Sequence, residues 1–101
     1  MKKLAVLASG QGTNLEAIFQ AIESGKVAAE VGLVISDREK APALIKAHKR
    51  GVNAQFIDPR PFTTREQYDR TLLEILCQDQ VDLVVLAGFM RLLSSVLVNA
   101  F

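Results

Sequence analysis

Hydrophobic and polar positions divide the chain into short apolar runs and longer segments in which apolar residues recur at helical spacing. The runs are typical of strands buried on both faces, and the longer segments are typical of helices with one buried stripe. The predicted strands are residues 3–8, 31–36, 54–57 and 82–87, and the predicted helices are residues 13–24, 42–50 and 63–79. A last short helix is predicted to begin at Ser94 or Ser95.

Strands that alternate with helices predict the α/β class, as a doubly wound, Rossmann-like parallel sheet with helices on both faces. Right-handed crossovers place the strands at 3–8 and 82–87 side by side at the centre of this sheet. Ligands of such sheets bind beyond the carboxyl ends of the strands, where the strand order reverses. The loops at 9–14 and 88–93 are therefore predicted to face one crevice.

Three residue patterns mark the helix boundaries. Thr13 and Glu16 have the spacing of a capping box, and so do Thr63 and Glu66, so helices are predicted to begin at both threonines. Gly25 stands after the first helix, where a left-handed backbone conformation often ends a helix.

A glycine-rich turn, residues 8–15, joins the first strand to the first helix. Such a turn aims backbone N–H groups and the positive end of a helix dipole at one point, which favours phosphate. Gly10 and Gly12 also suit a tight turn that binds no ligand, and both interpretations stay open. Leu15 stands where a dinucleotide fingerprint needs its third glycine, which favours a mononucleotide or sugar phosphate over a nicotinamide or flavin cofactor.

Five polar residues are the remaining candidates for chemistry. Asn14 lies at the helix entrance, either as a ligand or as a local turn contact. Arg65 lies in a first helical turn, where its charge opposes the helix dipole, and either a carboxylate or phosphate partner or a freely solvated side chain would account for it. Arg91 sits among apolar residues in the loop at 88–93, Asp37 is predicted to be a solvated loop acid, and His48 a surface residue. No nucleophile–base pair, paired carboxylates or metal-ligand cluster is evident, so the sequence predicts binding loops without a reaction centre.

Composition narrows the class of protein. With 101 residues, half of them apolar and 23% charged, the chain is predicted to form one globular domain over residues 1–101. Its net charge of +1 provides no basic field for nucleic acid and no basic amphipathic helix for a membrane surface. A phosphate ligand would therefore have to be held by local contacts.

The single cysteine and the opening residues bear on location. Cys77 excludes an internal disulfide, fits a reducing compartment and is predicted to be a small core residue. Residues 1–9 have an apolar core too short for a secretory signal and are interpreted as the first strand. The expected location is the cytoplasm.

The chain resembles the phosphoribosylglycinamide formyltransferase family over its whole length. The motifs that carry the resemblance lie in the family's order: Ala8 to Ile18, Val31 to Asp37, Thr64 to Asp69, and Asp82 to Ser94. The first and last of these motifs are specific, whereas the middle ones are weak when taken alone. Relatives that deformylate formyltetrahydrofolate or formylate methionyl-tRNA share the fold and part of the last motif, but their first loop differs.

The resemblance implies transfer of a formyl group from 10-formyltetrahydrofolate, the co-substrate, to the amino group of glycinamide ribonucleotide in purine biosynthesis, with no metal. It implies that the phosphate of the ribonucleotide is held by Gly12, Thr13 and Asn14. Arg65 would meet a carboxylate of the folate. The folate pocket would be lined, largely through backbone groups, by Met90, Arg91, Leu92 and Leu93.

The family's catalytic asparagine and histidine lie in an Asn-x-His-Pro segment on the next strand, followed later by an aspartate, and these 101 residues contain none of them. The chain is therefore expected to be an N-terminal, ribonucleotide-binding half that is inactive alone and forms homo-oligomers through the free edge of the strand at 82–87. The alternative is a non-catalytic module that binds a mononucleotide or sugar phosphate.

Overall fold

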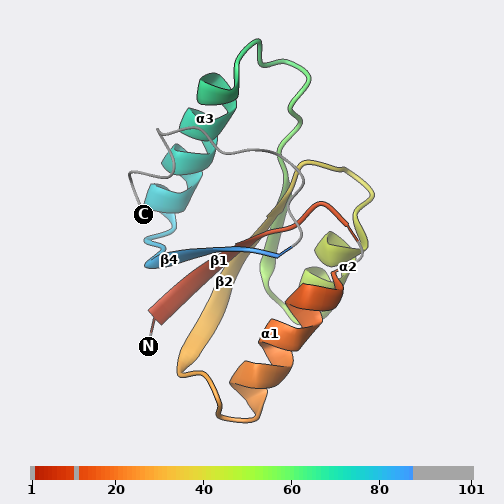
Figure 1. The fold of residues 1–101 in the computed structure, drawn as a ribbon, viewed down its shortest axis with the longest axis vertical. Helices are drawn as coiled ribbons and strands as arrows, with labels where there is room; N and C mark the ends of the chain where they lie inside the picture. The colour runs from red at the N-terminus through yellow and green to blue at the C-terminus, as the bar shows by residue number, and fades with distance from the viewer. Residues whose placement is uncertain (1, 11, 88–101) are drawn as a thin grey trace.

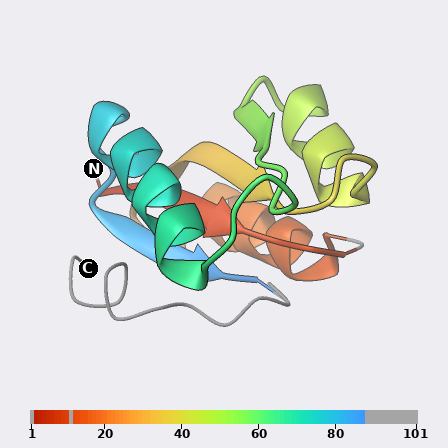
Figure 2. The ribbon, with the colours of Figure 1, turned by 90° about the horizontal axis from the view of Figure 1, so that it is seen from above.

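A parallel sheet of four strands forms the centre of the computed structural model, which describes residues 2–10 and 12–87. The strands are β1 (Lys2–Leu7), β2 (Ala29–Ser36), β3 (Asn53–Phe56) and β4 (Leu83–Leu86), and their order is β3-β2-β1-β4. Figure 2 shows β3 and β4 at opposite ends of this sheet. The predicted pairing of the first and fourth strands is confirmed, since β1 pairs in parallel with both β2 and β4.

Helices cover both faces of the sheet, as the α/β pattern predicted. Helices α1 (Thr13–Glu23) and α2 (Pro42–Lys49) lie on one side, and α3 (Arg65–Gln78) lies on the other (Figure 1). Because side chains alternate along a strand, Val6 of β1 packs with α1 and α2, whereas Ala5 and Leu7 pack with α3. The sheet therefore separates two apolar clusters.

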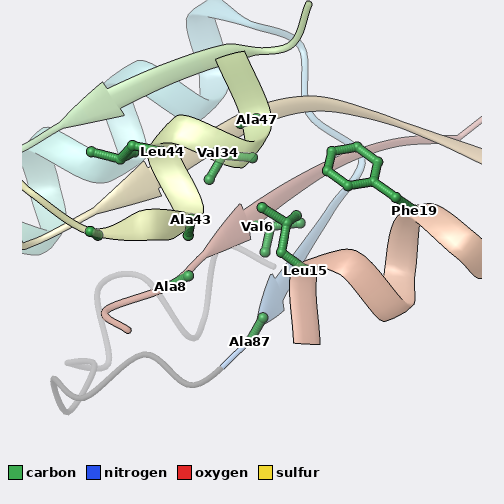
Figure 3. Packing of buried hydrophobic residues seen from close by; sticks show 10 residues of the cluster. Val6, Ala8, Leu15, Phe19, Val34, Ala43, Leu44, Ala47 and Ala87 are labelled. Carbon is green, nitrogen blue, oxygen red and sulfur yellow. The ribbon is translucent and has the colours of Figure 1, made fainter. Parts of the chain in front are cut away.

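Helices α1 and α2 pack together on one face of the sheet, with large apolar side chains from α1 and alanines from α2. Leu15 and Phe19 of α1 and Ala43 and Ala47 of α2 all point at Val6 or its neighbours in this cluster (Figure 3). Each is at most 7% exposed. The N-terminal end of α1 is thereby packed directly against α2.

The two predicted capping boxes do not form as predicted. Helix α1 does begin at Thr13, but its N-cap is Gly12, which has a φ of +82°, and no side chain caps it. Helix α3 begins one residue after Thr64, whose hydroxyl accepts a hydrogen bond from the Gln67 N–H at 3.2 Å. The Gln67 side chain accepts from the Thr63 N–H at 3.0 Å instead of the Thr64 N–H, so Thr64 caps α3 without the reciprocal bond of a capping box.

The predicted helix stop at Gly25 is confirmed, but the prediction for Cys77 is wrong. Gly25 has a φ of +81°, and its N–H donates to the Ile22 carbonyl at 3.1 Å. Cys77 is exposed, because α3 buries the stripe of Tyr68, Leu72 and Leu76 instead.

Strand β4 forms an uncovered edge of the sheet within the described residues. Leu83 and Leu86 are 49% and 52% exposed. A groove of about 480 Å³ runs between β4 and α1, and its lining is almost entirely apolar: Lys2, Leu4, Ala17, Ile18, Ala21, Val27, Ala28, Ala29, Leu83 and Val85. The chain therefore presents both an unpaired strand and an apolar surface beside it.

Gly12→Ala should destabilise the chain more than Gly25→Ala does. Both glycines have a positive φ, but the space around them differs. A Cβ on Gly12 would stand 2.9 Å from Cα of Ala43, whereas a Cβ on Gly25 would meet no heavy atom of the described residues within 4 Å. We expect losses in the free energy of unfolding of about 2–4 kcal/mol for Gly12→Ala and about 1–2 kcal/mol for Gly25→Ala. Urea denaturation of the two variants measures the difference, and equal losses would show that α2 yields to the added methyl group.

Candidate functional site

The turn after β1 leads the chain directly into the open N-terminus of α1. The Ala8 N–H extends the ladder by donating to the Ile35 carbonyl at 3.0 Å, and Ser9 is buried. Thr13 and Asn14 follow at the helix start with exposed side chains. The first N–H groups of α1 point out of its N-terminus, at the positive end of the helix dipole, and no side chain of residues 2–10 and 12–87 caps them. This arrangement is suited to an anion.

Helix α2 supports this turn from the side. Gly12 is buried, and its left-handed conformation keeps the backbone within contact distance of Ala43. Lys46, also on α2, places its Nζ 3.2 Å from Oε1 of Glu16, which lies in the first turn of α1. Glu16 has the spacing of a capping box with Thr13, but its carboxylate pairs with Lys46 instead. A lysine therefore lies beside the candidate anion site.

Neither Lys46 nor Glu16 was singled out from the sequence as a site residue. Thirty positions separate them, and no local pattern links residues at that distance. Two right-handed crossovers do place α1 and α2 on one face of the sheet, but only their packing brings these two side chains together. The general neighbourhood was predictable, and the ion pair was not.

Arg65 is the first residue of α3, and its side chain is exposed. In the described part of the chain no side chain pairs with its guanidinium. Helix α3 covers the opposite face of the sheet from α1 (Figure 1). Each helix begins after a parallel strand, so the two helix starts reach the same edge of the sheet from opposite faces.

The predicted folate loop is the part of the site that the structure does not describe. Met90, Arg91, Leu92 and Leu93 lie outside the described residues, and so do the turn at 88–91 and the helix predicted from Ser94 or Ser95. The described chain ends at Ala87, whose N–H donates to the Leu7 carbonyl at 2.9 Å. Residue 87 is therefore held beside the end of β1, next to the glycine turn.

Asp37 differs from the predicted solvated loop acid. It is only partly exposed, and its Oδ1 is buried with no hydrogen-bond partner within the described ranges. It lines a cavity of about 350 Å³ at the ends of β2 and β3, together with Glu39, Lys40, Phe56, Asp58, Pro59 and Arg60. In that cavity the hydrogen bonds from Arg60 lower the pKa of the Asp58 carboxyl below its usual value.

The other candidates give no further site among residues 2–10 and 12–87. His48 is exposed on α2, as predicted. No group of three potential metal ligands occurs in these ranges. No helix within them is long and apolar enough to cross a membrane.

Comparison with known proteins identifies the fold and the family. A model of the formyl transferase family matches residues 2–101. The chain is 38% identical to phosphoribosylglycinamide formyltransferase of Escherichia coli, covering 97% of this chain and 46% of that protein. It is 39% identical to the trifunctional purine biosynthetic protein adenosine-3 of Gallus gallus, covering 91% of this chain and 9% of that protein.

The same result comes from solved structures. The crystal structure of glycinamide ribonucleotide transformylase 1 from Symbiobacterium toebii superimposes with a TM-score of 0.95 at 42% identity, covering all of this chain and 48% of that one. The chain thus spans about half the length of the bacterial relatives it matches. Since the family match extends over nearly every residue and the fold agrees this closely, the chain belongs to the formyl transferase family.

Proposed function

We propose that this chain provides the ribonucleotide-binding half of a phosphoribosylglycinamide formyltransferase. The enzyme would transfer a formyl group from 10-formyltetrahydrofolate to the amino group of glycinamide ribonucleotide in purine biosynthesis. The observation that carries this proposal is the agreement along the entire chain, at 42% identity, with a glycinamide ribonucleotide transformylase. Fold alone would not select a substrate, because one fold hosts many activities.

Gly12, Thr13 and Asn14 would hold the phosphate of the ribonucleotide. The uncapped start of α1 supports this role, because its free N–H groups need acceptors and its dipole attracts negative charge. A phosphate supplies several acceptor oxygens at once. The close approach of the turn to α2 would fix these donors before the substrate arrives.

Arg65 would bind a carboxylate of the folate, and Met90, Arg91, Leu92 and Leu93 would line the folate pocket through backbone groups. The exposed guanidinium of Arg65 without an internal ion pair in the described structure supports the first assignment. The folate supplies the formyl carbon, and these residues would orient it. The acid–base groups would come from the second half of the domain.

The expected setting is the cytoplasm, and the proposal requires no metal, nucleic acid or membrane. Cys77 is exposed and is the only cysteine, which fits a reducing compartment. In the absence of a second half, copies of the chain would associate through β4.

The purified 101-residue chain should bind ribose 5-phosphate and glycinamide ribonucleotide weakly at the glycine turn, and it should not transfer formyl groups. Binding follows from the free N–H groups of α1, and the lack of turnover follows from the absence of a general acid–base group. An NMR titration should move the amide signals of Gly12, Thr13 and Asn14, and an assay with both substrates should give no product.

Amide shifts confined to other residues would refute the phosphate assignment. Turnover by the chain, free of any longer protein, would refute its assignment as a binding half. Phosphate binding by the complete protein without any folate binding would instead favour a non-catalytic sugar-phosphate module.

Arg65→Ala should weaken folate binding by about 1.5–3 kcal/mol in the complete enzyme that contains this chain, because a charge-assisted hydrogen bond is lost. Arg70→Ala is the matched control, since Arg70 is an exposed arginine on the same helix. Calorimetry with the folate co-substrate measures both variants. If the two variants bind folate as tightly as the parent, Arg65 does not belong to the pocket.

The 101-residue chain should form dimers or larger species in a concentration-dependent way. The free edge of β4 and its exposed Leu83 and Leu86 are the expected contact. Light scattering should show a lower mean mass after Leu83→Lys or Leu86→Lys. Ile45→Lys is the control, because Ile45 is equally exposed but lies on α2. A clean monomer at all concentrations would contradict association through this edge.

A further inference from the structure

We infer that the ion pair between Lys46 and Glu16 sets the affinity of the glycine turn for phosphate. Lys46 acts as a positioning residue: it neutralises the one carboxylate in the first turn of α1, so that the helix start stays attractive to a phosphate dianion. This inference rests on the proposed phosphate site at Gly12, Thr13 and Asn14 and adds a residue from a different helix to it.

The carboxylate of Glu16 occupies the part of α1 that a bound phosphate would use. A carboxylate in the first turn of a helix interacts favourably with the same positive end of the dipole that a bound phosphate would use. An unpaired Glu16 would therefore compete with the ligand and repel it. The Lys46 ammonium, 3.2 Å from the Glu16 carboxylate, cancels most of that charge at close range.

The aliphatic stem of Lys46 lies against the glycine turn. A Cβ on Gly12 would lie 3.2 Å from Cδ of Lys46, so the aliphatic stem of the lysine passes directly over the backbone of the turn. The same side chain thus touches the turn with its stem and the first helical turn with its ammonium group. Lys46 and Glu16 are 30% and 45% exposed, so both charges remain within reach of solvent and ligand.

A charge effect and a mechanical effect of the ion pair predict different changes in phosphate affinity when Glu16 is replaced. If the pair only clamped α1 to α2, loss of either partner would loosen the turn and weaken phosphate binding in both cases. If the pair balances charge, Lys46→Met exposes an anion and weakens binding, whereas Glu16→Gln removes that anion and strengthens it. The methionine keeps an aliphatic stem against Gly12, so the packing on the turn is retained.

The helix pair contains its own matched control. Arg50, the C-cap residue of α2, forms an ion pair with Glu23 at the other end of α1. Seven residues of helix separate Glu16 from Glu23, roughly 10 Å, which exceeds the screening length of about 8 Å at physiological salt. Arg50→Met and Glu23→Gln therefore change the net charge equally but act far from the turn.

The experiment is an NMR titration of the 101-residue chain and its variants with ribose 5-phosphate, read at the amides of Gly12, Thr13 and Asn14. We expect Lys46→Met to weaken and Glu16→Gln to strengthen binding by about three- to tenfold each, with the double variant near the parent. The Arg50→Met and Glu23→Gln controls should change the affinity by less than about twofold.

The outcomes separate this inference from the function on which it rests. If the parent chain shows no shifts at the turn, the phosphate site itself is refuted, and this inference with it. If the parent binds but Lys46→Met and Glu16→Gln shift the affinity in the same direction, or neither shifts it more than the controls do, the site stands and the charge role of Lys46 is overturned.

Discussion

The pairing of β1 between two parallel neighbours is the constraint on which the rest of the structure depends. Ala5, Val6 and Leu7 are fully buried, because β2 and β4 close the two edges of the strand and helices close its two faces. Strand β2, which lies between β3 and β1, is enclosed in the same way at Leu33, Val34 and Ile35. Since all four strands are parallel, their carboxyl ends meet at one edge, and every candidate binding residue follows one of those ends or begins a helix there.

Close packing of α1 on α2 gives that general topology a specific geometry at the start of α1. The contact depends on small residues: Gly12 on one side, and Ala43 on the other. A larger residue at either of these positions would push the start of α1 away from α2. Such a shift would also separate Lys46 from Glu16. Backbone geometry, helix packing and local charge are therefore linked at one turn, so a phosphate site here cannot be understood from the glycines alone.

The sequence predicted the elements well and their side-chain partners less well, for physical reasons. Hydrophobic periodicity depends on which face is buried, and it located the four strands and three helices that the described residues form. It also placed β1 beside β4, because crossover handedness leaves few alternatives. Spacing alone does not choose the cap of α3, because Thr63 and Thr64 each have a Glu or Gln three residues later. Cys77 was misplaced because a helix pattern near its end does not show which of two adjacent residues turns inward.

Contacts between side chains that are distant in the sequence depend on tertiary packing, and the resemblance to a family does not predict them. Glu16 has the spacing of a capping residue, but its carboxylate forms an ion pair with Lys46 on the next helix. The N-cap position is occupied by Gly12, so no threonine hydroxyl is in place to complete a capping box with Glu16. The assignments of Gly12, Thr13, Asn14 and Arg65 stay predictions about ligands.

For the proposed phosphate site, the local distribution of charge matters more than the net charge of the chain. With a net charge of +1 there is no long-range field to attract a phosphate, so the attraction must come from groups within a few ångströms. Helix α1 supplies such groups at its uncapped start, but it carries Glu16 in the same turn. A single acid there would offset much of what the helix dipole contributes, since both effects are of similar size. Lys46 of α2 pairs with this acid, so under the proposal the two helices together, rather than the glycine turn by itself, would form the smallest unit that binds the anion.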